Sequence, residues 1–89
     1  MVQVTQIHFA GGSQHEHIAA VRWLNPEDGS AGQNTREEMV AWLRKPGSRA
    51  TVSDGSRTVE VGIVEAHPPY LRTHADGAWT DNLLALPRF

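Results

Sequence analysis

The stretch Thr35–Gly47, TREEMVAWLRKPG, decides the fold, because it is the clearest helix signal in this chain of 89 residues. Thr35 and Glu38 have the spacing of a capping box, in which a hydroxyl and a carboxylate each accept a hydrogen bond from a first-turn amide. Pro46 and Gly47 then end the pattern. The stretch therefore predicts one helix over about residues 35–45.

The apolar residues of this helix lie on one side. Met39, Val40 and Leu43 form an inner stripe, and Trp42 flanks it. A helix of about ten residues is marginal in water by itself. We therefore expect the helix to pack on a sheet.

Two strands are predicted before the helix, Val2–Phe9 and Ile18–Leu24, and the glycine-rich turn between them favours a hairpin. The apolar phase changes within the first strand, which predicts a bulge near Thr5-Gln6. The segment Asn25–Asn34, NPEDGSAGQN, is polar and rich in glycine, so we expect a long loop there.

Three further strands are predicted after the helix: Arg49–Ser53, Arg57–Ala66 and Tyr70–Ala75. Asp54-Gly55 joins the first two, and Asp76-Gly77 offers a second tight turn that leads back through residues 78–80. Asp81 can cap a short helical turn over residues 82–86, whose leucines would close the open end of the sheet or dock a partner.

The order β-β-α-β-β-β predicts an α+β fold with a mainly antiparallel sheet, one amphipathic helix and a short C-terminal helical turn. With 89 residues and no linker-like segment, residues 1–89 are expected to form a single small domain.

Composition narrows the function. The chain has no cysteine, which excludes disulfides and thiolate metal sites. Its formal charge of −2 disfavours sequence-independent binding of nucleic acid through a broad basic surface. Its longest apolar run is far too short for a membrane span, and the N-terminus lacks the pattern of a signal peptide. We therefore expect a cytoplasmic protein without membrane association.

The segment His15-Glu16-His17-Ile18 suggests a metal site, because residues two apart on an extended strand face the same way. A zinc site needs three or four protein ligands, and no third ligand lies at a spacing that forces it to converge with His15 and His17. The alternative is a polar hairpin end whose imidazoles bond to backbone or water. No metal or other cofactor is expected.

Tyr70, Arg72 and His74 share one face of a predicted strand, and Trp79 lies on the returning segment. Tyrosine, tryptophan and arginine are enriched at protein-binding hot spots, and aromatic side chains can also stack on bases. The alternative is structural: Tyr70 packs on the helix, and Arg72 pairs with Glu65 or Asp81. Motifs for a serine nucleophile, a phosphate loop or a cysteine nucleophile are missing, so an enzyme is not expected.

The C-terminal part carries a family resemblance. Tyr70-Leu71-Arg72-Thr73, Asp76-Gly77 and the run from Asp81 to Pro87 resemble the ending Y-L-R-T-x-x-D-G-x-x-x-D-N-L-L-x-L-P. That ending marks a family of small proteins from bacteria and their phages, catalogued as a domain of unknown function. The resemblance implies a cytoplasmic protein of a bacterial cell or phage, and it supplies no catalytic residues.

The leading hypothesis is a small cytoplasmic module that binds another protein through His15, His17, Tyr70, Arg72, His74 and Trp79, in the setting of a phage accessory protein acting on a host component. The alternatives are a module for single-stranded nucleic acid and a metal-binding protein using His15 and His17. An exposed sheet edge in so small a chain also favours a homodimer.

Overall fold

The predicted helix is present in the computed structural model, which describes residues 1–53 and 55–89. Helix α1 covers Arg36–Leu43, and Thr35 is its N-cap. The amide of Glu38 donates to Thr35 Oγ1 at 3.2 Å, and the amide of Thr35 donates to Glu38 Oε1 at 2.9 Å, which confirms the capping box. Met39 and Val40 are buried, so this face packs on the sheet as expected.

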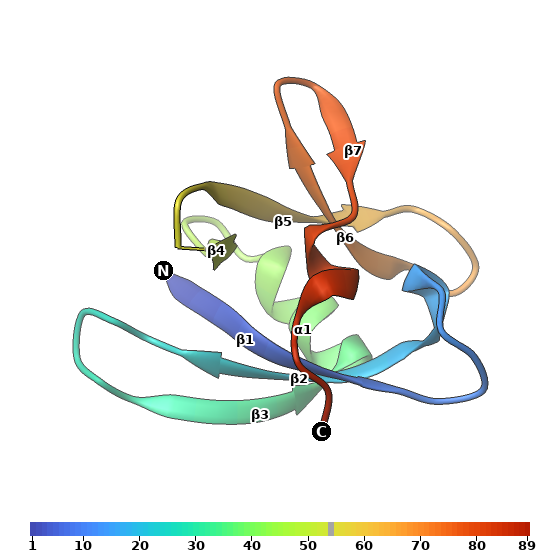
Figure 1. Cartoon of the computed structure of the whole chain (residues 1–89), viewed down its shortest axis with the longest axis horizontal. Helices are drawn as coiled ribbons and strands as arrows, with labels where there is room; N and C mark the ends of the chain where they lie inside the picture. The colour runs from blue at the N-terminus through green and yellow to red at the C-terminus, as the bar shows by residue number, and fades with distance from the viewer. Residues whose placement is uncertain (54) are drawn as a thin grey trace.

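In the described residues, seven strands form one sheet in the order β3-β2-β1-β4-β5-β6-β7. The strands are β1 Val2–Phe9, β2 Ile18–Leu24, β3 Ala31–Thr35, β4 Ala50–Ser53, β5 Thr58–Val64, β6 Tyr70–Ala75 and β7 Ala78–Thr80; two 3-10 turns are η1 His15–His17 and η2 Asn82–Ala85. The neighbouring strands pair antiparallel except for β1 and β4, which are parallel. Figure 1 shows β1–β3 on one side of α1 and β4–β7 on the other. The α+β class is confirmed.

The predicted strand order is incomplete, because the expected loop Asn25–Asn34 is wrong in its second half. Residues from Ala31 onward form β3, which pairs with β2 from Leu24 to Ala20. Gly32 lies against the indole of Trp23, where a Cβ would come within 2.5 Å of the ring. The indole N–H of Trp23 donates to Asn34 Oδ1 at 2.7 Å. These contacts hold a strand that shows no apolar alternation.

The predicted bulge in β1 is confirmed. The register with β2 shifts between Val4 and Gln6. Val4 and Ile7 are both buried, although an unbroken pleat would turn residues three apart to opposite faces. The bulge therefore lets both ends of β1 contribute to the same core.

The two hairpins predicted after the helix are confirmed as strand pairs. β4 pairs with β5, although Asp54 of the connecting turn lies outside the described residues. β6 pairs with β7, and Asp76 (φ 53°) and Gly77 (φ 78°) both have the positive φ of a tight two-residue turn. β7 is an additional strand beyond the predicted order.

One edge of β1 holds two other segments of the chain. Val2 and Gln3 pair with β4 at one end. At the other end, the Ile7 amide donates to the Pro87 carbonyl and the Phe89 amide donates to the Ile7 carbonyl, both at 3.0 Å. The C-terminal segment thus returns across the molecule to β1 after η2 (Figure 1).

The turn η2 covers the core, as the structural interpretation of its leucines predicted. Leu83 is fully buried, whereas Leu84 and Leu86 are half-buried against the core. Within the described residues, no helix has the length and apolar character that a membrane span requires.

Leu83→Ala should lower the free energy of unfolding by about 2–5 kcal/mol, because the truncation leaves a cavity in a fully buried position. Leu86→Ala is the matched control, and its loss should be smaller since Leu86 is already half-exposed to water. Urea unfolding followed by tryptophan fluorescence measures both. Equal losses in the two variants would contradict the assigned role of η2.

Candidate functional site

The side of β6 that faces away from the core carries three predicted site residues, Tyr70, Arg72 and His74, here called the stripe. Tyr70, Arg72 and His74 are half-buried, whereas Leu71 and Thr73 between them are fully buried in the core. The alternation follows from the two-residue period of a strand. The structure therefore places these three predicted site residues on one face.

Trp79 joins this stripe from β7. It pairs with His74 across the β6–β7 hairpin, and the two rings meet edge to face with centroids 5.7 Å apart. Gly62 on β5 lies beneath both rings, since a Cβ there would be 2.9 Å from His74 Cδ2 and 3.3 Å from Trp79 Cζ3. Trp79 is nevertheless 46% exposed. The indole is thus positioned by its neighbours without being buried by them.

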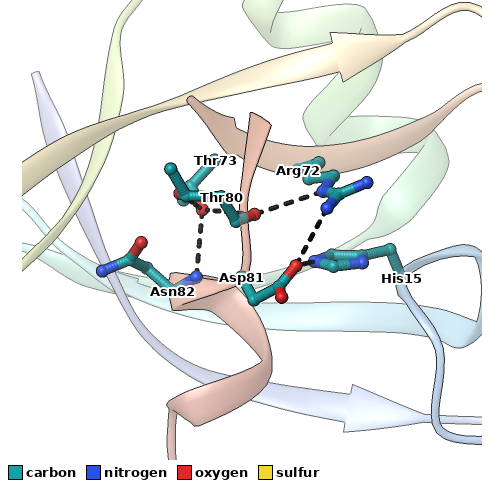
Figure 2. Close-up of polar contacts among 6 residues, drawn as sticks. All are labelled: His15, Arg72, Thr73, Thr80, Asp81 and Asn82. Atoms are coloured by element: carbon teal, nitrogen blue, oxygen red, sulfur yellow. Dashed lines mark hydrogen bonds and ion pairs between the residues drawn. The ribbon is translucent and has the colours of Figure 1, made fainter. Parts of the chain in front are cut away.

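Arg72 is fixed at the rim of the sheet (Figure 2). Its Nη2 lies 2.9 Å from Asp81 Oδ1, and its Nε donates to the Thr80 carbonyl at 3.2 Å. Of the two structural partners considered for Arg72, Asp81 is the observed one, and Glu65 instead forms a two-point pair with Arg44. Arg72 thus has a defined direction and a partly neutralised charge.

The expected capping role of Asp81 is wrong. Its side chain makes no capping hydrogen bond to η2 and faces Arg72 instead. The hydroxyl of Thr73 supports the start of η2, because it accepts the Asn82 amide at 3.2 Å and lies 2.6 Å from the Thr80 hydroxyl (Figure 2). Sequence reasoning therefore named Asp81 as a partner of Arg72 but did not include it among the site residues.

His15 reaches the same cluster from η1. Its Nε2 is buried, lies 3.7 Å from Asp81 Oδ1, and has no hydrogen-bond partner within the described part of the chain. Burial lowers the pKa of His15, and the positive charge of Arg72 lowers it further. The lowered pKa favours the neutral form of His15, although the exposed carboxylate of Asp81 acts in the opposite direction.

His17 does not join His15. The two residues form a 3-10 turn instead of an extended strand, so the expectation that they face the same way is wrong. His17 Nδ1 accepts the Gln14 amide at 3.2 Å and its ring lies against Gly12. Among residues 1–53 and 55–89, no three histidine, aspartate or glutamate side chains are grouped to hold a metal ion.

Tyr70 lies beside a hollow at the other end of β6. This hollow has a volume of about 470 Å³, and Arg36, His67 and Pro68 contribute to its wall. Arg36 is directed there by its hydrogen bond to the Glu16 carbonyl at 2.8 Å. The stripe therefore runs from a hollow at Tyr70, lined by both Arg36 and Glu16, to the exposed indole of Trp79.

The free energy of unfolding should fall as the pH is lowered from 7.5 to 5. The pKa of His15 is lowered in the folded state, so the unfolded chain binds the proton first, and stability is lost as the pH falls below the ordinary pKa of 6.5. Urea midpoints measured across this range should decline less in His15→Gln. The exposed His67→Gln variant is the control. A wild-type decline that persists unchanged in His15→Gln would contradict the assignment.

The comparisons with known proteins show a family without an assigned activity. No curated protein and no solved structure shows significant similarity to the chain. A family model described as protein of unknown function (DUF3892) matches residues 3–87. The match spans nearly all of the 89 residues. The chain therefore belongs to the DUF3892 family of proteins of unknown function.

Proposed function

We propose that this chain is a protein-binding module whose contact surface is the β6–β7 face, defined here as Tyr70, Arg72, His74 and Trp79. The observation that carries the proposal is the position of Trp79. It stands 46% exposed on a hairpin that projects from the body of the molecule (Figure 1).

Exposure of Trp79 leaves a large apolar area in water that a partner surface can bury. An indole gives a large contact area at a low cost in conformational entropy, and tryptophan, tyrosine and arginine dominate the binding energy of many interfaces. Three of the four residues on the β6–β7 face are of these types. The composition of the face thus favours recognition of another protein.

The β6–β7 face is ordered before any partner arrives. His74 contacts the Trp79 ring, and Gly62 provides the space in which both rings lie. Asp81 and the Thr80 carbonyl fix the guanidinium of Arg72. A face that is already ordered loses less entropy on binding, which favours affinity.

The charge around Arg72 favours a protein over single-stranded nucleic acid. Asp81 pairs with Arg72, and Glu60 on the neighbouring strand β5 pairs with Arg49. Nucleic-acid binding draws on cationic side chains that neutralise phosphates. Arg72 and Arg49 are each already matched by a carboxylate, which reduces the electrostatic support that this part of the sheet could give to phosphate binding.

The biological setting of the proposal comes from the sequence resemblance. A small protein of a bacterial cell or phage that lacks a catalytic role would act in the cytoplasm by binding a host component.

A second copy of the chain is another partner that the fold allows, since β3 and β7 form the two ends of the sheet. Light scattering on the purified chain distinguishes a self-partner from a different protein.

Trp79→Ala should abolish capture of the partner when the tagged chain is incubated with lysate of the organism that encodes it. Loss of a central interface tryptophan typically costs about 2 kcal/mol or more, which is roughly a thirtyfold loss of affinity. Leu24→Ala is the matched control, because Leu24 is also an exposed large apolar residue but lies on β2. Mass spectrometry identifies the captured protein.

The double variant Arg72→Ala, His74→Ala extends the test along the same strand and should also lose the partner. A partner retained by both the Trp79 variant and the double variant would refute the β6–β7 face as the contact surface. Binding of single-stranded nucleic acid that weakens steeply with salt would favour the alternative function instead.

A further inference from the structure

A second hollow lies between α1 and the strands β2 and β3, away from the β6–β7 face. Its volume is about 270 Å³, and Trp23, Trp42, Met39, Asn34 and Glu38 contribute to its wall. Trp23 comes from β2 and Trp42 from the last turn of α1. Two indoles that are distant in the sequence therefore line one pocket.

The Trp23 wall of this pocket is held in place. Trp23 faces the helix side with Val21, two residues earlier on β2, and its ring lies on Gly32 of β3. Its indole N–H donates to Asn34 Oδ1 at 2.7 Å, and Asn34 Nδ2 donates to Glu38 Oε1 at 3.4 Å. The ring thus has a fixed orientation beside a fixed carboxylate.

Glu38 makes the pocket negative. Among the described residues that line it, Glu38 is the one that carries a charge. The pKa of Glu38 is lowered because its carboxylate accepts a hydrogen bond from the Thr35 amide and another from Asn34. The amide of Glu38 already donates to Thr35 Oγ1, so this N–H is not free to bind an anion in the pocket. The electrostatics therefore favour a cation.

We propose that the pocket between α1 and β2–β3 binds a quaternary or methylated ammonium group, with Trp23 and Trp42 as aromatic walls and Glu38 as the counter-charge. A methylated ammonium is attracted to the faces of indole rings and is too weakly hydrated to lose much on leaving water. The group can belong to a free small molecule or to a methylated lysine side chain of a protein. The site is independent of the β6–β7 face.

Choline and its neutral isostere 3,3-dimethylbutan-1-ol test this proposal on the full chain. The two probes have nearly the same shape, and only choline carries the charge. Nuclear magnetic resonance follows the indole N–H signals of the three tryptophans, of which Trp79 lies outside the pocket and is an internal reference. Choline should shift the Trp23 and Trp42 signals and leave Trp79 unchanged. The isostere should bind about tenfold more weakly, the factor expected for a cation–π contact.

Glu38→Gln tests the counter-charge without removing the helix cap, because glutamine at this position also completes a capping box. It should weaken choline binding about threefold, as expected for loss of a nearby opposite charge. Glu37→Gln is the matched control: it makes the same change on the adjacent residue, which pairs with Arg36 and does not line this pocket. Thermal melts establish that both variants fold.

A third variant and a peptide pair complete the test. Trp42→Leu should also weaken choline, because it replaces one aromatic wall with an aliphatic one. If a peptide containing trimethyllysine binds more tightly than choline, the ammonium group that the pocket recognises belongs to a protein side chain. If choline binds more tightly, the group belongs to a free small molecule. Equal binding of choline and the isostere, equal shifts of all three indoles, or unchanged affinity in Glu38→Gln would each overturn the proposal.

Discussion

One edge of β1 is the constraint on which the rest of the molecule depends. At its first residues this edge binds β4 through two residue pairs, and at Ile7 it binds the C-terminal segment. The other edge of β1 is occupied by β2. The β1–β3 and β4–β7 parts of the sheet therefore meet through short contacts on a single strand. The bulge between Val4 and Gln6 adapts that strand so that Val4 and Ile7 both enter the core.

The elements that the sequence predicts well are those with local causes. The capping box, the change of apolar phase in β1 and the Asp76-Gly77 turn each depend on residues a few positions apart, and each is present. Strand β3 has a different cause. Its segment AGQNT has no apolar alternation, and it pairs with β2 because Gly32 admits the Trp23 ring and Asn34 accepts its N–H. Those partners are about ten residues away, so a local pattern does not reveal them.

The same distinction applies to the candidate site. Alternation along β6 suffices to place Tyr70, Arg72 and His74 on one face, and the tight turn suffices to bring Trp79 beside His74. The approach of His15 to Asp81 joins residues 66 positions apart, and it follows from the docking of η1 and η2 against β6. The position of Asp81 directly before η2 likewise predicts a local capping bond. Its carboxylate bonds instead to Arg72, which is charged and therefore a stronger partner.

The distribution of aromatic side chains connects the fold with recognition. The buried apolar residues of the described chain are valine, isoleucine, leucine, methionine and alanine, with no tryptophan, tyrosine or phenylalanine among them. In small domains aromatic residues usually supply much of the buried area. Here the fully buried positions lack them, and Trp23 and Trp42 pack half-buried against the core while Trp79 stays exposed. Trp23 is held by a hydrogen bond and a close glycine, Trp79 by a ring contact and a close glycine, and Trp42 by packing against the core. Because none of the three is enclosed by the core, their remaining surface is open to a ligand or a partner.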